Sequence, residues 1–247
     1  MTPTPILTDT TDITATLSSE TITVWYGLIK TQDNDYRRYW KMLNANEQHY
    51  AQQLKNEQVH KRYVAVHGQL RKLLAQILQQ APAKTIISKT THGKPYLADY
   101  PQLAFNISHS GSVFVIAIAW NCQLGIDVEN YKMRPNLAGL VKKCFAPEET
   151  IYWHQLPDEQ KTAEFYRFWT RKEAFVKATG FGIALGLQHC VINPEQPNAF
   201  LRIPNQCGNV TSWCVKDINL PYTETLNVYC ALSANKIITI VQLNELA

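Results

Sequence analysis

Hydrophobic side chains recur in two stretches of the chain at the three- and four-residue spacing that places them on one face of a helix. Between about Asp158 and Gly180 this face consists of Phe165, Phe168, Trp169, Phe175 and Val176. Over residues 59–78 it consists of Val59, Tyr63, Val66, Leu70, Leu73, Leu74 and Ile77. The pattern predicts two long amphipathic helices, one in each half of the chain, the second ending at a glycine suited to a helix C-cap.

Runs of β-branched and aromatic residues, several of them alternating with polar ones, predict strands elsewhere. In the first half the strands cover residues 21–29, 103–108 and 113–120, after 20 residues that are expected to form a loose lead-in. In the second half they cover residues 124–128, 211–215, 225–232 and 237–243. Shorter helices are expected from Asn44, around Lys142 and Lys143, and from Ala146-Pro147.

Each half therefore holds one long helix and a few strands, an α/β organisation of the α+β kind. We expect two closely packed lobes, an N-terminal lobe over residues 1–122 and a C-terminal lobe over residues 123–247 that carries metal-binding acids. The halves share no residue-level repeat. Because clefts between packed units are common ligand sites, we expect the acidic pair that opens the second half to lie in the seam.

Charged residues stand in these elements at positions that a simple solvated surface does not explain. Asp127 and Glu129 are two residues apart in a strand, so their carboxylates leave the same face roughly 6–7 Å apart and can converge on one cation. On the second helix, Glu173 borders the apolar face and Lys177 follows one turn later, so the two could pair. Lys172 falls inside that face, where it is expected either to extend towards solvent or to reach a phosphate.

The segment Ser108-His109-Ser110-Gly111 separates two strands and is predicted to form a turn. Hydroxyls, an imidazole and backbone amides around a glycine bend suit a phosphate. His109 is equally compatible with a nucleophile-activating base or with a structural role, but no Gly-x-Ser-x-Gly motif supports a hydrolase triad. On the first helix, Arg62 and Arg71 are further candidates for a functional role.

Composition narrows the class of protein. The 247 residues are 45% hydrophobic and 18% charged, as in ordinary globular proteins, and the net charge of +4 suits an anionic ligand or an acidic protein partner. The six cysteines show no Cys-x-x-Cys spacing, so free thiols are expected rather than a zinc site. The longest apolar run, residues 113–120, is too short to cross a bilayer, and no secretory signal is recognisable. We therefore expect a cytoplasmic protein that binds neither membrane nor nucleic acid.

Five blocks follow one another between about residues 60 and 186, and two glycines, Gly180 and Gly182, come after them. The blocks are Gly93-Lys94-Pro95, Phe105-Asn106-Ile107-Ser108-His109-Ser110, Gly125-Ile126-Asp127-Val128-Glu129, Phe145-Ala146-Pro147-Glu148-Glu149 and Trp169-Thr170-Arg171-Lys172-Glu173-Ala174-Phe175-Val176-Lys177. In this order they resemble the 4'-phosphopantetheinyl transferases of the Sfp type, which activate carrier proteins of fatty-acid, polyketide and nonribosomal-peptide synthesis. The resemblance implies a pseudo-dimeric two-lobe fold, in which each lobe packs a small, mainly antiparallel sheet on a long helix.

The resemblance also implies a site for coenzyme A. Asp127, Glu129 and Glu173 would hold Mg²⁺, or Mn²⁺, on its pyrophosphate, which agrees with the preference of hard cations for oxygen ligands. Lys177 would lie near the same phosphates. The other implied contacts to the 3'-phosphate and diphosphate come from Arg62, Lys94, Ser108 and His109.

The implied reaction is attack by a carrier-protein serine on the β-phosphorus of coenzyme A, which releases adenosine 3',5'-bisphosphate. The nucleophile then belongs to the partner, which explains why the chain shows none of its own. The metal ion and cationic side chains should supply most of the stabilisation of the charge that develops as the pyrophosphate is cleaved. Asp127 and Lys177 are the implied catalytic residues beside them. Glu173 is the best candidate for the general base, although it is also an implied metal ligand, and both roles stay open.

Two other functions are compatible with the same residues: a Mg²⁺-dependent phosphohydrolase of coenzyme A or another dinucleotide, and a non-catalytic module that binds carrier proteins. Three gathered carboxylates argue against the second. If the two halves arose by duplication, one chain would supply both lobes, so a monomer would be sufficient for activity. The segment 180–187 and the basic residues between 132 and 143 are candidate docking surfaces for an acidic carrier-protein helix.

Overall fold

The computed structural model describes residues 6–8, 17–236 and 239–244. Its helices are α1 Asp33–Trp40, α2 Ala45–Gln53, α3 Glu57–Leu78, α4 Leu137–Cys144, α5 Pro147–Gln155 and α6 Asp158–Thr179. Its strands are β1 Ile6–Thr8, β2 Thr21–Leu28, β3 Ile87–Lys89, β4 Pro95–Leu97, β5 Leu103–Ser110, β6 Val113–Trp120, β7 Leu124–Asn130, β8 Val191–Ile192, β9 Phe200–Arg202, β10 Cys214–Asp217, β11 Val228–Ala234 and β12 Thr239–Asn244. The expected mixed α/β composition is confirmed.

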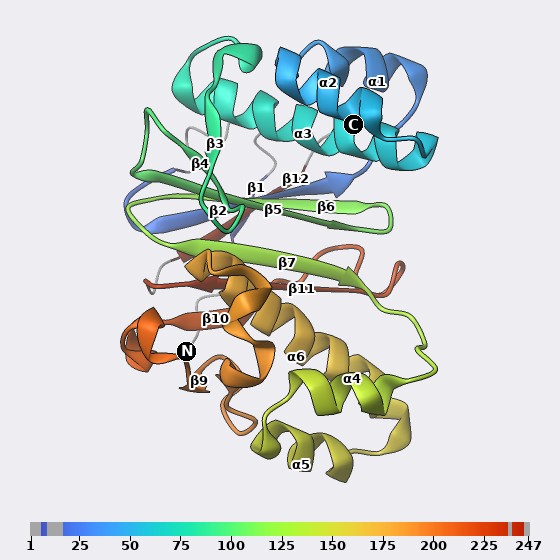
Figure 1. Ribbon diagram of the computed structural model, residues 1–247, viewed down its shortest axis with the longest axis vertical. Helices are drawn as coiled ribbons and strands as arrows, with labels where there is room; N and C mark the ends of the chain where they lie inside the picture. The colour runs from blue at the N-terminus through green and yellow to red at the C-terminus, as the bar shows by residue number, and fades with distance from the viewer. Residues whose placement is uncertain (1–5, 9–16, 237–238, 245–247) are drawn as a thin grey trace.

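Two sheets form the middle of the molecule (Figure 1). The first has the order β1-β12-β2-β6-β5, in which β2, β6 and β5 run antiparallel while β12 is parallel to both β2 and β1. The second is antiparallel throughout, with the order β10-β11-β7. Strand β12 comes from the end of the chain yet lies in the sheet built mainly by the first half.

The elements stack in four layers (Figure 1). Helices α1, α2 and α3 cover the outer face of the first sheet, and α6, with α4 and α5 beside it, covers the outer face of the second. Alternate residues of facing strands fill the space between the sheets, among them Val24, Val113, Val115, Leu124, Ile126, Val128 and Leu232. Because β5 and β7 are edge strands of the two sheets and lie against each other, the seam between the sheets runs along them.

The two long helices are confirmed with nearly the predicted bounds. Helix α6 ends at Gly180, whose backbone adopts φ of 75° and whose N–H donates to the carbonyl of Val176. Helix α2 begins after Asn44, whose side chain accepts from the N–H of Glu47, while the Glu47 carboxylate accepts from the N–H of Asn44. This reciprocal capping fixes the start of the helix that the sequence placed at Asn44.

The structure corrects several of the expected strands and turns. Ser108, His109 and Ser110 belong to strand β5, and the turn consists of Gly111, with φ of 58°, and Ser112. In the lead-in, Ile6–Thr8 is a strand, and the other residues before 17 lie outside the described residues. Residues 211–212 belong to a 3₁₀ turn before β10, β11 begins at Val228, and residues 237–238 of the last predicted strand lie outside the described part.

Candidate active site between α6 and β7

Helix α6 lies directly on strand β7, and Gly125 makes this approach possible. A Cβ at that position would lie 2.8 Å from the carbonyl carbon of Lys177, and closer still to the backbone of Ala174 and Ala178. Any other residue would push the helix away from the strand. The glycine of the Gly125–Glu129 block therefore sets the distance between the helix and the acids that follow on β7.

Lys177 joins α6 to β7 through Asp127. Its ammonium donates to Oδ1 of Asp127 at 2.6 Å, to Oγ of Ser108 at 2.9 Å and to the carbonyl of Ile126 at 3.3 Å. The predicted pairing of Lys177 with Glu173 on the same helix is therefore not formed. The reason is that Asp127 is 4% exposed and needs a nearby counter-charge more than Glu173 does.

Glu129 is held by two neutral donors. Ser110 donates its hydroxyl to Oε2 at 3.2 Å, and the indole N–H of Trp169 donates to Oε1 at 3.3 Å. Burial, followed by the charge of Asp127, raises the pKa of Glu129. The carboxylate thus has a fixed orientation, but no described residue forms an ion pair with it.

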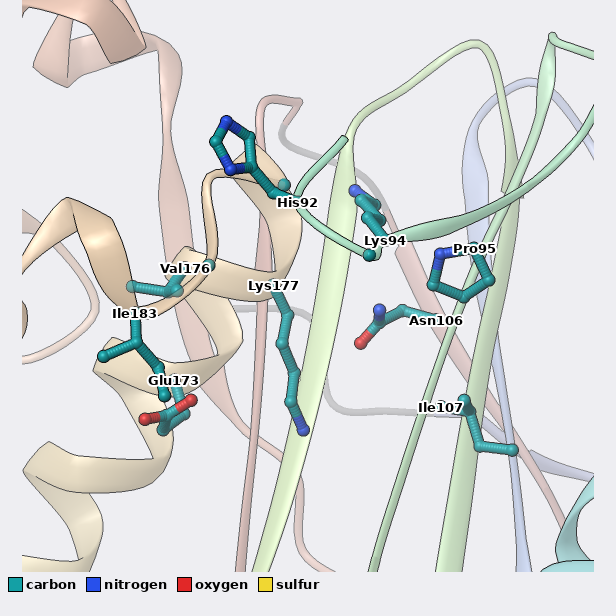
Figure 2. A pocket seen from close by; sticks show the side chains of 12 residues that line it. His92, Lys94, Pro95, Asn106, Ile107, Glu173, Val176, Lys177 and Ile183 are labelled. Carbon is teal, nitrogen blue, oxygen red and sulfur yellow. The ribbon is translucent and has the colours of Figure 1, made fainter. Parts of the chain in front are cut away.

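Glu173 faces a cavity of about 230 Å³ between α6, β5 and the turn before β4 (Figure 2). Burial, followed by the charge of Asp127, raises its pKa to about 7. In the described part of the chain, no hydrogen bond or ion pair involves this carboxylate. The cavity is lined by His92, Gly93, Lys94, Pro95, Asn106, Ile107, Glu173, Val176, Lys177, Gly180, Gly182 and Ile183.

Lys94 lines the same cavity but directs its ammonium elsewhere. The nitrogen donates to the carbonyl of Ala178 at 2.6 Å and to that of Leu124 at 3.2 Å, so it ties the turn before β4 to the end of α6. Burial lowers its pKa to about 8. Its implied contact with a phosphate stays a prediction.

Arg62 and His109 lie near each other at the end of β5. The protein around His109 excludes enough water to lower its pKa, and the charges of Arg62 and Lys177 lower it further, although the ring keeps contact with solvent. Among the described residues, none forms an ion pair or hydrogen bond with the Arg62 guanidinium. An unpaired guanidinium beside a histidine suits an anion.

A second cavity of about 560 Å³ shares Gly93, Pro95 and Ile107 with the first. Sequence reasoning missed most of its wall, which includes Asn44, Glu47, Tyr50, Tyr63, His67 and Lys89. Tyr63 and His67 stack with ring centroids 3.8 Å apart, and burial lowers the pKa of His67 to about 4. Their spacing of one helical turn on α3 was the available signal, but it is also the spacing of ordinary core residues.

The structure contradicts both roles expected for Lys172. Its side chain is fully buried, and its ammonium donates to Oε2 of Glu149 at 2.6 Å and to the carbonyl of Leu187 at 3.0 Å. The ammonium of Lys172 therefore reaches neither solvent nor the cavity, because Glu149 in the first turn of α5 supplies the counter-charge inside the core. Arg71 is likewise buried and pairs with Glu47.

Among the residues that the structure describes, no three His, Cys, Asp or Glu side chains are gathered closely enough to hold a metal ion. The acids are nevertheless neighbours, since after burial the charge of Asp127 contributes most to the raised pKa of Glu129 and Glu173. Oδ2 of Asp127 is buried, and none of the described residues forms a hydrogen bond with it. Such an oxygen fits a site that a divalent cation completes, and the role of the three acids as ligands stays a prediction.

The comparisons with known proteins match both halves of the chain. A family model described as the 4'-phosphopantetheinyl transferase superfamily matches residues 123–231, and one described as 4'-phosphopantetheinyl transferase, N-terminal, matches residues 30–121. The 4'-phosphopantetheinyl transferase HetI of Nostoc sp. is 34% identical over 186 residues, which cover 74% of this chain and 78% of the relative.

Two Bacillus proteins are similar over shorter stretches. The 4'-phosphopantetheinyl transferase of Bacillus subtilis is 38% identical over 106 residues, 43% of this chain and 46% of the relative. The 4'-phosphopantetheinyl transferase psf-1 of Bacillus pumilus is 35% identical over 126 residues, 50% of this chain and 53% of the relative. Taken with the match to the Nostoc protein, these similarities place the chain in the 4'-phosphopantetheinyl transferase superfamily.

Proposed function

We propose that this protein transfers 4'-phosphopantetheine from coenzyme A to a serine of an apo carrier protein. The observation that carries the proposal is the meeting of Asp127, Glu173 and Lys177 where α6 crosses β7, beside a cavity. A pair of acids and a lysine at a pocket suit a pyrophosphate and its cation rather than a neutral ligand. Because the chain belongs to a family of transferases, a purely non-catalytic role loses its support.

Asp127, Glu129 and Glu173 are the residues that would hold Mg²⁺, or Mn²⁺ in its place. When bound, the cation would supply positive charge to the pyrophosphate oxygens. Asp127 offers the buried oxygen that lacks a donor, and Glu173 offers a carboxylate without any partner in the described structure. Glu129 is already oriented by Trp169 and Ser110.

Glu173 is also the proposed general base. Its pKa of about 7 matches a group that accepts a proton near neutral pH. In the proposed step the serine oxygen bonds to the β-phosphorus, the serine proton passes to Glu173 directly or through water, and the bond from phosphorus to the bridging oxygen breaks. Adenosine 3',5'-bisphosphate leaves, and the ammonium of Lys177 would meet the charge on its phosphate.

The nucleotide part of coenzyme A is proposed to occupy the two adjoining cavities, whose shared wall is Gly93, Pro95 and Ile107. Arg62 and His109 line neither of these two cavities, and Arg62 instead lines a third cavity of about 430 Å³. Because no described residue forms a hydrogen bond or ion pair with its guanidinium, Arg62, with His109 near it, is proposed to meet the 3'-phosphate there. Ser108 has little capacity left for a phosphate. Its hydroxyl donates to Asp127 and accepts from Lys177 and from the N–H of Val128.

A two-lobe arrangement with a boundary near residue 122 is part of the proposal. Helices α3 and α6 each have 22 residues, and each packs on one of the two sheets, which supports a pseudo-dimer. Such a chain would act as a monomer in the cytoplasm. None of the helices in the described part of the chain combines the length and apolar character needed to span a bilayer.

The carrier protein is proposed to dock beside α4 and α5. A groove of about 600 Å³ lies there, lined by Lys142, His154 and several apolar residues, of which Ile151 is 60% exposed. Basic groups around an apolar patch suit an acidic helix. The second candidate docking surface is the segment 180–187. It includes Ile183, which is 83% exposed and lines the cavity that Glu173 faces.

The decisive experiment is intact-mass analysis of an apo carrier protein incubated with this protein, Mg²⁺ and coenzyme A. A gain of one phosphopantetheine on the carrier, absent when its acceptor serine is replaced by alanine, is the expected result. Release of nucleotide from coenzyme A with no carrier present, and with no mass gain when a carrier is added, would instead identify a phosphohydrolase.

A further inference from the structure

Three polar side chains on one face of β5 join it to β7. They occupy every second residue of the strand, and each accepts a hydrogen bond from a backbone N–H of β7. The rungs are Ile126 to Asn106 at 2.9 Å, Val128 to Ser108 at 3.3 Å, and Asn130 to Ser110 at 2.9 Å. Figure 2 shows the first of these residues, Asn106, with its amide beside strand β7. We call this set the polar ladder.

The ladder exists because β7 is an edge strand. It pairs with β11 on one side only, and the N–H groups of its even-numbered residues from 126 to 130 point away from β11, towards β5. In this buried seam water is not available to them, so they need acceptors from the protein. A strand places alternate side chains on one face, so Asn106, Ser108 and Ser110 meet this need at the correct spacing.

Two rungs of the ladder also reach the acids of β7. The hydroxyl of Ser108 donates to Oδ1 of Asp127 at 2.9 Å, and that of Ser110 donates to Oε2 of Glu129 at 3.2 Å. Each serine thus binds the carboxylate of one residue and the N–H of the residue after it. A single hydroxyl therefore fixes both the side chain of an acid and the peptide group that follows it.

Glu129 depends on this arrangement more than Asp127 does. Asp127 is also held by the ammonium of Lys177, whereas Glu129 has only the hydroxyl of Ser110 and the indole of Trp169 as donors among the described residues. A carboxylate with two long, neutral hydrogen bonds is free to rotate when one of them is removed.

We propose that Ser110 is a positioning residue that holds Glu129 in the orientation needed for a divalent cation. The inference rests on the proposed function, because it assigns Ser110 a part in the cation site of that reaction. Ser110 touches neither substrate nor cation in this role and acts only through Glu129. The polar ladder thereby couples the packing of the two sheets to the site between them.

The test compares wild type, Ser110→Ala and Ser110→Thr in Mn²⁺ titrations with coenzyme A present and no carrier protein, followed by electron paramagnetic resonance. Ser110→Ala should weaken Mn²⁺ binding about 10–100-fold, the effect of losing a partner that orients a ligand. Ser110→Thr keeps the hydroxyl and should restore most of the affinity. In the transfer assay, the rate of Ser110→Ala should recover as Mg²⁺ is raised.

Ser233→Ala is the matched control. Ser233 is a buried serine of β11 whose hydroxyl donates to the carbonyl of Cys214 and forms no hydrogen bond with any of the three acids. The Ser233→Ala substitution should leave the Mn²⁺ affinity unchanged even if it lowers the melting temperature. A Ser110→Ala protein that binds Mn²⁺ as wild type does, while wild type modifies the carrier, overturns the role of Ser110 alone. If wild type binds no Mn²⁺ in the presence of coenzyme A, both this role and the metal assignment are overturned. If wild type binds Mn²⁺ but never modifies a carrier protein, the proposed reaction is overturned.

Discussion

The ammonium of Lys177 lies 2.6 Å from Oδ1 of Asp127, and this contact links the last turn of α6 to the middle of β7. The aspartate is nearly inaccessible to water, whereas the lysine is 29% exposed at its side chain. The lysine is therefore the partner that can move when an anion or a cation arrives, and the aspartate is the fixed point. Chemistry at this site should depend on the charge of Asp127 more than on its shape.

Asp127→Asn tests this dependence on charge. Asparagine keeps an oxygen for Ser108 and Lys177, so the melting temperature should stay close to that of wild type. Loss of the charge should lower the transfer rate by about 100-fold or more, as for other groups that stabilise developing charge. The rate is followed by intact mass of the carrier protein, and Asp99→Asn, at an exposed position, is the control. Near-normal transfer by Asp127→Asn would refute the role of this acid.

Gly125→Ala should destabilise the protein strongly. The added Cβ would meet the backbone of Ala174, Lys177 and Ala178, which cannot shift as a flexible side chain can. Overpacking of this kind costs about 3 kcal/mol or more in the free energy of unfolding, measured by urea denaturation. At Gly139 the nearest atoms to an added Cβ belong to the exposed side chain of Asn136, which caps α4 and can move, so Gly139→Ala should cost no more than the loss of that cap, about 1 kcal/mol. Equal costs for the two variants would contradict the proposed close approach.

The long helices could be predicted from sequence because their apolar faces repeat over several turns, so single exceptions do not hide the period. The strand 113–120 is predictable for a related reason: all but its last residue are buried, and its run is continuous. The short strands of the last third have no such redundancy. Their ends are set by turns such as that of residues 210–212, which tertiary contacts decide.

The error at Ser108-His109-Ser110 has a specific cause. Small polar residues next to a glycine favour a turn when only local sequence is considered. In the fold Ser108 and Ser110 serve as hydrogen-bond acceptors for a distant edge strand, and only the pairing of the two sheets reveals this need. Lys172 shows the same limit, since its partner Glu149 lies 23 residues earlier in the chain. Sequence can indicate that a buried charge needs a partner, but it does not name it.

The pair Lys172 and Glu149 should be coupled energetically, because both side chains are fully buried. Lys172→Met leaves a carboxylate in the core without its cation, and breaking such a pair costs about 3–5 kcal/mol of unfolding free energy. In the double variant Lys172→Met/Glu149→Gln the uncompensated charge is gone, and the new amide side chain retains an oxygen for the N–H of Ile192. The double variant should therefore be more stable than Lys172→Met alone in urea denaturation. A double variant whose cost equals the sum of the single costs would show that the pair is not coupled.

Arg62→Ala should raise the KM for coenzyme A about 10-fold or more and leave the KM for carrier protein unchanged, because a charge-assisted hydrogen bond to phosphate is lost. Its neighbour Lys61 provides the control, since it already pairs with Glu57 at 2.8 Å on the surface. With dephospho-coenzyme A, which lacks the 3'-phosphate, the effect of Arg62→Ala should shrink. An equal effect with both substrates would place Arg62 away from the 3'-phosphate.

Lys94 gives a prediction for stability against pH. Burial lowers its pKa from 10.5 to about 8, so between these values the unfolded chain holds a proton that the folded chain has lost. Unfolding then takes up a proton, and the free energy of unfolding must rise as pH increases through this window. The cost of burying the ammonium is fully present below about pH 8 and is absent above pH 10.5.

The size of the effect is at most on the order of 3 kcal/mol, given the lowering of the Lys94 pKa from 10.5 to about 8. It is measured as the difference in unfolding free energy between wild type and Lys94→Met, by urea denaturation at about pH 7.5, 9 and 10.5 without ligand. Other titrating groups are the same in both proteins and cancel in this difference, which should grow in favour of wild type as pH rises. A constant difference would mean that Lys94 is as well solvated in the folded protein as in the unfolded chain, and that its contacts with Leu124 and Ala178 form in water rather than in the interior.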